Sequence, residues 1–184
     1  MILPITLYGN PVLRRETQDV DMSKEELAEL IANMFETMYG ANGVGLAAPQ
    51  VGMSLRLFVI DSEPFKEMYP EEPTRKQAFI NPRITKRYGE EWAFNEGCLS
   101  LPDIHEDVMR PSTIDITYLD ENLVERQETI SGGAARIIQH EYDHLEGMVF
   151  TDRLSNLKKM ILKRKLTDIA TGKKAPAYKF KRNK

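Results

Sequence analysis

The sequence predicts an α+β fold, with small mixed or antiparallel sheets packed around a central helix and one further helix toward each end of the chain. Two observations support this: apolar residues recur at helical spacing in three segments, and strand-like segments lie between the first two of them. The chain has 184 residues, 41% of them hydrophobic, which is enough for one well-buried core and short for two. We therefore expect a single domain over residues 1–184.

The first helix is expected to begin at a capping box. Ser23 can cap the third helical amide while the Glu26 side chain reaches back to the N-cap. Gly40 can end the helix in the left-handed conformation. The residues expected to face the core recur at helical spacing and are Leu27, Leu30, Ile31, Met34 and Met38.

A stretch of small residues follows at 43–52 and contains one isolated polar side chain, Gln50. A structural turn would explain its glycines but would give no task to Gln50, whose amide needs partners if it is buried. The stretch lacks the Lys and Ser/Thr of a phosphate-binding loop. Gln50 is therefore a candidate functional residue.

Four segments are typical of β-strands. Residues 56–61 are rich in β-branched and aromatic side chains, and residues 77–84 continue an extended pattern in which Pro82 suggests a sheet edge or a strand end. Residues 113–118 and 123–130 alternate well enough to form a hairpin. The proline-bearing segment 62–74 is expected to be an exposed loop.

The central helix is expected from an N-cap at Ser131 to about Glu146, where Gly147 ends it. It carries the sequence H-E-x-x-H, formed by His140, Glu141 and His144. Side chains at i and i+4 share a helix face, so the two imidazoles can bind one metal ion while Glu141 acts as a general base. The alternative reading of this motif alone is a solvated helix turn with two surface histidines.

Cys98 is the sole soft candidate for a third metal ligand, because it is the only cysteine in the chain. The alternative reading of this residue alone is a small buried hydrophobe, which a cysteine often is. A catalytic site usually takes three protein ligands and leaves one position open. Two imidazoles and one thiolate would leave a divalent ion with a net charge of about +1, which favours ionisation of a bound water.

A final helix is expected from Ser155 to about Thr171. From Ser155 onward there are 11 Lys or Arg residues and a single acid, Asp168. Residues 172–184 are expected to be a mobile basic tail. A solvated basic face is the default account of this charge, and binding to an RNA backbone is the alternative.

Cellular location is indicated by three negative features. A lone cysteine suits a reducing compartment, the N-terminus lacks the basic and apolar regions of a signal peptide, and no apolar run is long enough to span a bilayer. We expect a soluble cytoplasmic protein without membrane association, and a monomer.

Three motifs together resemble those of bacterial peptide deformylases. They are G-x-G-x-A-A-x-Q at residues 43–50, E-G-C-x-S at 96–100 and H-E-x-x-H at 140–144, in the family's order and spanning most of the chain. The resemblance implies a cytosolic metal-dependent amidase that removes the formyl group from formyl-methionyl nascent polypeptides and releases formate. It also implies Fe²⁺ as the native ion, with Zn²⁺, Ni²⁺ or Co²⁺ as substitutes, held by Cys98, His140 and His144.

The resemblance also implies roles for individual residues. A metal-bound hydroxide would attack the formyl carbon, with Glu141 as general base and then general acid. The Gln50 side-chain amide and the Leu99 backbone N–H would stabilise the oxyanion. The substrate would pair as an extended strand with backbone groups. The expected substrate-binding residues are Gly43, Val44, Gly45, Glu96, Gly97, Arg136 and Ile137, and of these Val44, Ile137 and the aliphatic part of Arg136 are candidates for the methionine pocket.

Two positions depart from the family pattern. Gly133 stands where relatives often carry a larger apolar residue, which bears on the shape of the methionine pocket. His105 stands where many relatives carry an arginine that braces the glutamate corresponding to Glu96. His105 either takes over this bracing in a weaker, pH-dependent form or is simply exposed. The long C-terminal helix resembles that of the bacterial form that contacts the ribosome, which makes the ribosome a candidate partner.

Two other functions compete with this reading. A general endopeptidase of the H-E-x-x-H class usually takes His or Glu as its third ligand and binds longer substrates in a wide cleft. A non-catalytic, metal-stabilised module could bind ribosomal RNA through the basic tail. Release of formate from a formyl-methionyl peptide distinguishes the three.

Overall fold

The computed structural model describes residues 1–182 of the chain. Its helices are α1 (Lys24–Gly40), α2 (Gly132–Leu145) and α3 (Asn156–Ala170). Its strands are β1 (Ile5–Thr6), β2 (Gly45–Ala47), β3 (Leu57–Asp61), β4 (Lys76–Cys98), β5 (Leu101–Leu119), β6 (Glu125–Ser131) and β7 (Phe180–Lys181). Short 3-10 helices lie at η1 (Pro11–Arg14), η2 (Ala48–Val51), η3 (Glu63–Phe65) and η4 (Phe150–Arg153). The architecture is α+β, as the sequence predicts.

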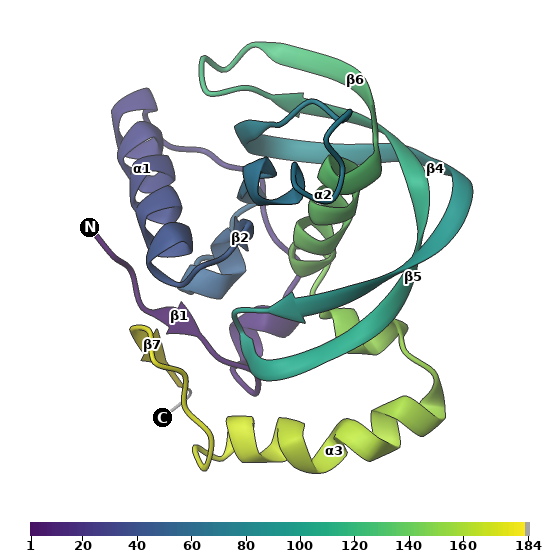
Figure 1. Ribbon diagram of the computed structural model, residues 1–184. Coiled ribbons are helices and arrows are strands. Elements are labelled where there is room, and N and C mark those ends of the chain that lie inside the picture. Colours follow the sequence, from purple (N-terminus) through teal and green to yellow (C-terminus); the bar gives the residue numbers. More distant parts are fainter. Residues whose placement is uncertain (183–184) are drawn as a thin grey trace.

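Two sheets organise the chain. Five strands form an antiparallel sheet in the order β2-β3-β4-β5-β6, and β1 pairs separately with β7 in parallel. The β4–β5 ladder runs from Ile80 opposite Leu119 to Cys98 opposite Leu101 and contains four register shifts. Such irregularities bend and twist paired strands. The two long strands accordingly curl around α2 (Figure 1).

Helix α2 is enclosed on nearly every side. All of residues 133–145 are buried. The reason is the topology: α2 contacts β2, β3, β5 and β6 of the curled sheet, and also η2. A helix held in this way presents its functional side chains in fixed geometry.

The start of α2 is capped differently from the sequence prediction. Ser131 occupies the N-cap position as predicted, but its side chain makes no capping hydrogen bond. The Glu72 carboxylate instead accepts the Gly133 N–H at 2.7 Å. Glu72 lies in the loop 62–74, so this largely exposed loop is anchored to the first turn of the central helix.

The predicted capping box of α1 is confirmed by reciprocal hydrogen bonds between Ser23 and Glu26. The predicted hairpin is confirmed as the β5–β6 pair. Both alternatives for Pro82 are wrong, because β4 continues to Cys98 and lies between β3 and β5 in the sheet. Pro82 is tolerated inside this strand because the β3–β4 ladder ends at Ile80 and the β4–β5 register shifts between Ile80 and Arg83.

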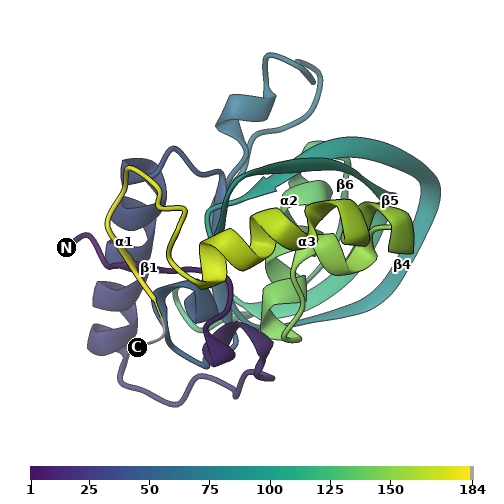
Figure 2. The ribbon, with the colours of Figure 1, turned by 90° about the horizontal axis from the view of Figure 1, so that it is seen from below.

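The C-terminal segment differs from the expected mobile tail at 172–184, of which residues 183–184 lie outside the described part. After α3 the chain returns toward α1 and β1 (Figure 2). There Ile5 N–H donates to the Lys179 carbonyl at 2.9 Å and Leu7 N–H to the Lys181 carbonyl at 3.1 Å. Within residues 1–182, no helix has the length and apolarity needed to cross a membrane.

Candidate active site

Three metal-ligand atoms converge between β4 and α2. Cys98 ends β4, while His140 and His144 lie one turn apart on α2, and the ligand atoms of all three residues lie within 4.8 Å of one another. The Cys98 Sγ atom is 3.4 Å from the His144 Nε2 atom. The structure thus brings together the three residues that the sequence predicts as ligands.

The surroundings of the histidines fit a metal ion. His140 Nδ1 lies 2.9 Å from a Glu96 carboxylate oxygen, which orients the ring and leaves Nε2 free for a ligand. Burial, followed by the charge of a protonated His140, lowers the pKa of His144 to about 3, so His144 is a neutral imidazole near pH 7. A neutral imidazole is the form that binds a metal. A Cys/His/His set suits Zn²⁺ or Fe²⁺ equally well.

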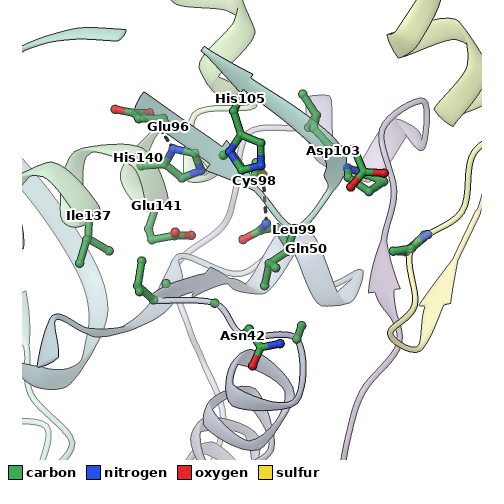
Figure 3. Close-up of a pocket in the computed structure, with 18 of the residues that line it drawn as sticks. Asn42, Gln50, Glu96, Cys98, Leu99, Asp103, His105, Ile137, His140 and Glu141 are labelled. Atoms are coloured by element: carbon green, nitrogen blue, oxygen red, sulfur yellow. Dashed lines mark hydrogen bonds and ion pairs between the residues drawn. The ribbon is translucent and has the colours of Figure 1, made fainter. Parts of the chain in front are cut away.

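Glu141 points into the same space without a hydrogen-bond partner for Oε2 in residues 1–182 (Figure 3). Burial raises the pKa of Glu141 to about 7. A carboxyl group with this pKa can take up and release a proton near neutral pH. The Glu141 carboxylate can lie this close to the backbone of β2 only because residue 45 is glycine, since a Cβ atom there would lie 2.3 Å from Glu141 Oε1.

Gln50 is buried, and its amide orientation is fixed at both ends. Its Oε1 atom accepts the Ala47 N–H at 2.9 Å. Its Nε2 atom lies 3.2 Å from the Ser100 Oγ atom and 3.4 Å from the Cys98 Sγ atom. The amide N–H groups of Gln50 are therefore directed at the metal-ligand cluster, and its polar end points toward that of Glu141 (Figure 3).

Leu99 lies in the two-residue turn between β4 and β5. Its backbone N–H makes no hydrogen bond to another group within residues 1–182. The following residue is held firmly, since the Ser100 carbonyl accepts the Tyr8 N–H at 2.8 Å and the Ser100 side chain is bonded to Gln50. The turn thus offers one free donor beside Cys98.

Arg110, rather than His105, braces Glu96. The Arg110 guanidinium donates to both Glu96 oxygens, at 2.6 and 2.9 Å, and to Asp143 at 2.8 Å. His105 is exposed, so the bracing role considered for it is wrong. Arg110 was not among the predicted site residues, although it lies at even spacing from the apolar residues Ile104 and Val108 on one strand, which places all three on the same face.

The expected substrate-binding residues all line one cavity of about 770 Å³, which is within the range of ligand pockets. Arg136 connects α2 to both β4 and β5 in the wall of this cavity. Its guanidinium donates to Glu96 at 3.0 Å and to the carbonyls of Val108 and Trp92 at 2.9 and 2.6 Å. Phe94 also lines the cavity, as do Phe65 and residues 175–178, which the sequence did not predict for the site.

The absent side chain at Gly133 is replaced by an aromatic ring. A Cβ atom on Gly133 would lie 2.8 Å from the Phe65 ring and 3.4 Å from the Tyr69 ring. Phe65 also packs on Phe94, with ring centroids 5.3 Å apart, and joins the same apolar cluster as Val44 and Ile137. The loop 62–74 therefore supplies apolar surface that α2 lacks at this position.

Comparison with known proteins gives consistent matches. A sequence profile described as polypeptide deformylase matches residues 2–160. A peptide deformylase from Christiangramia forsetii is 52% identical over 188 residues, covering 98% of this chain and 96% of the relative. A second, from Flavobacterium johnsoniae, is 51% identical with the same coverage.

Solved structures agree with these sequence matches. A peptide deformylase from Legionella pneumophila superposes with a TM-score of 0.80 at 38% identity, covering 96% of this chain and 100% of the other. The peptide deformylase from Thermus thermophilus gives a TM-score of 0.80 at 40% identity, covering 92% and 98%. The similarity therefore extends over the whole folded unit, including every element that carries the candidate site.

Proposed function

Because this chain belongs to the polypeptide deformylase family, whose members remove the formyl group from nascent polypeptides, we propose that its reaction is carried by Glu141, Gln50 and Leu99. The chain is an enzyme of this class. The single observation that carries the residue assignment is geometric. A carboxylate with no partner and two preorganised donor groups surround one Cys/His/His cluster in the described residues 1–182.

Fe²⁺ is the ion we propose for this cluster, with Zn²⁺, Ni²⁺ or Co²⁺ as substitutes, held by Cys98, His140 and His144. When bound, such an ion polarises the formyl oxygen and acidifies a water molecule. The protein's contribution is the orientation of its ligands, since Glu96 contacts His140 Nδ1 and is itself held by Arg110.

Glu141 is proposed as the proton carrier. Its carboxylate accepts a proton from the attacking water and later delivers it to the departing amine as the formyl C–N bond breaks. The raised pKa of Glu141, about 7, suits both transfers near neutral pH. Formate and a free N-terminal methionine are then the two products.

The developing negative charge on the formyl oxygen is proposed to be stabilised by the Gln50 amide and the Leu99 N–H. Such donors act best when they are oriented before the reaction begins. The bonds from Ala47 to Gln50 and from Gln50 to Ser100 supply this orientation.

The substrate is proposed to bind as an extended strand along residues 43–45 and 96–97, through backbone groups. Backbone pairing does not depend on side chains, so many nascent chains can be processed. The methionine side chain is proposed to lie among Val44, Ile137 and the aliphatic part of Arg136, with Phe65 and Phe94 completing the pocket.

Three properties of the whole protein are also proposed: a cytoplasmic location, a monomeric state and contact with the ribosome through α3. The support for the last is the outer surface of α3. There the exposed side chains of Leu157, Met160 and Ile161 lie among the exposed lysines at 159, 163 and 165. Co-sedimentation with ribosomes, and its loss on substitution of these three lysines, tests the contact.

Formate release is the direct test of the proposed function. Anaerobically purified, metal-loaded protein is incubated with formyl-Met-Ala-Ser and, separately, with an N-terminally blocked peptide that offers only internal bonds. We expect formate from the first substrate and no new amines from the second. Cleavage of the internal bonds would favour the endopeptidase reading, and the absence of formate from fully loaded protein would exclude deformylation.

A further inference from the structure

The C-terminal segment reaches the active-site cavity from the far end of the chain. Residues 175–178 line that cavity, and β7, which follows them, pairs with β1. Figure 1 shows β7 beside β1, on the side of the molecule opposite β6. The Lys174 Nζ atom also forms an ion pair with Asp103 at 2.7 Å, which ties the start of this segment to β5.

Two side chains of this segment bond to carbonyls next to the proposed oxyanion donors. The Tyr178 hydroxyl donates to the Leu99 carbonyl. The Lys181 Nζ atom donates to the Val51 carbonyl at 3.1 Å, and Val51 directly follows Gln50. Both turns that supply a donor are therefore held by the same short stretch of chain, residues 178–181.

The side chains of Lys181 and Tyr178 lie in closely packed surroundings. A Cβ atom on Gly52, which has φ +87°, would lie 2.0 Å from the Lys181 Nζ atom, so the lysine packs directly on the turn that follows Gln50. Burial, followed by the charges of Cys98 and Asp103, raises the pKa of Tyr178. The tyrosine hydroxyl therefore stays protonated and acts as a donor at neutral pH.

We propose that the C-terminal segment fixes the geometry of the oxyanion hole, the site formed by the Gln50 amide and the Leu99 N–H. Tyr178 and Lys181 are positioning residues for the turns carrying Leu99 and Gln50. Neither residue is needed to touch the formyl group or the metal ligands. They act by fixing the distance between two donors that lie on separate loops, and transition-state stabilisation depends on such fixed geometry. This inference rests on the oxyanion role proposed above.

The experiment compares three variants of the full chain. Tyr178→Phe removes one hydroxyl and keeps the ring, and Lys181→Met removes one ammonium group and keeps most of the stem. Lys179→Met is the matched control, because the Lys179 Nζ atom bonds to the Ile2 carbonyl at 3.0 Å and touches neither turn. Formate release gives kcat and KM for each, with metal content and melting temperature measured alongside.

We expect kcat to fall about three- to tenfold in the first two variants, the range expected for one lost hydrogen bond that orients a catalytic group. KM, metal content and melting temperature should stay near wild-type values, and the control should match wild type throughout. Wild-type kcat in Tyr178→Phe and Lys181→Met would overturn the proposal. An equal loss of kcat in the control would also overturn it, by showing that general docking of the segment is responsible.

A double-mutant cycle locates the effect. If Lys181 acts through Gln50, then Lys181→Met should cause no further loss of kcat when Gln50 is already replaced by Leu, whereas Tyr178→Phe should retain its effect. An undiminished effect of Lys181→Met in that background would overturn the role of Lys181. A wild-type enzyme that releases no formate would refute the proposed function instead, so the two failures are distinguishable.

Discussion

The guanidinium of Arg110 and the carboxylate of Glu96 form a bidentate ion pair, and the Glu96 carboxylate also contacts His140 Nδ1. The side chains are 2% and 4% exposed, and the two hydrogen bonds measure 2.6 and 2.9 Å. The pair joins β5 to β4, and through Asp143 and His140 it joins both strands to α2. The same ion pair therefore holds three elements together and orients one proposed metal ligand.

Replacing Arg110 by Met should destabilise the fold by about 3–5 kcal/mol, because it leaves the Glu96 carboxylate buried without its main partner. Denaturant-induced unfolding of the apo-protein measures this directly. Arg83→Met is the control, since Arg83 pairs with Asp19 on the surface, where both side chains are about half exposed. The control should lose no more than about 1 kcal/mol. Equal losses in both variants would contradict a special role for Arg110.

Replacing Gln50 by Leu should lower kcat by about 10²-fold or more, the usual effect of removing one oxyanion donor. Metal content should not change, because Gln50 is not one of the three ligands. Gln77→Leu removes a glutamine amide that bonds to Tyr118 away from the cavity, and it should keep wild-type turnover. Near-native turnover in Gln50→Leu would remove Gln50 from the mechanism.

Glu141→Gln should retain the metal and lose about 10²- to 10⁴-fold in turnover, since the amide cannot accept the proton. Cys98→Ser should instead weaken or alter metal binding itself, because the hydroxyl is a poor substitute for a thiolate. Metal analysis beside formate release separates the two cases. Loss of metal from Glu141→Gln would argue that Glu141 is a ligand and not a proton carrier.

Much of the site could be predicted because its signals are local. The i, i+4 spacing places His140 and His144 on one helix face whatever the rest of the fold does. Gln50 could also be predicted from local sequence, because it is the one polar side chain in a stretch of small residues and its amide needs partners if it is buried. The order of helices and strands likewise follows from periodicity within short windows.

The remainder depends on contacts between residues that are distant in the sequence. The partner of Glu96 is decided by the β4–β5 register, and four shifts in that ladder cannot be read from alternation alone. The position of Tyr178 depends on β7 pairing with β1, across nearly the whole chain. The basic composition of residues 172–184 led to the prediction of a mobile tail, because composition does not show that this segment pairs with β1.

Gly45→Ala should inactivate the enzyme although it adds one methyl group. The new Cβ atom would lie 2.3 Å from Glu141 Oε1, and α2 is too tightly enclosed to move away. We expect turnover to fall to the level of Glu141→Gln, with the metal retained. Gly40→Ala is the control, because its Cβ atom would meet only the flexible end of Ile2 at 3.3 Å. Full activity in Gly45→Ala would show that Glu141 can work from a different position.

Phe65→Ala should weaken selection of methionine. The Phe65 ring fills the space beside Gly133 and packs, as Val44 does, against the apolar cluster that contains Ile137, so its removal leaves that wall of the pocket incomplete. We expect kcat/KM for a formyl-methionyl peptide to fall about tenfold or more relative to one with a bulkier apolar first residue, since differences in pocket contact of this size are typical of apolar subsites. Parallel assays of the two peptides measure the ratio.

The reciprocal substitution tests whether Phe65 stands in for a side chain on α2. Gly133→Leu alone should displace the Phe65 ring, because its Cβ atom would lie 2.8 Å from it, and should destabilise the protein by about 1–3 kcal/mol through overpacking. Combined with Phe65→Ala, the leucine has room and should restore both stability and methionine preference toward wild type. The two positions are then coupled in a double-mutant cycle. Additive effects would mean that the loop and α2 shape the pocket independently.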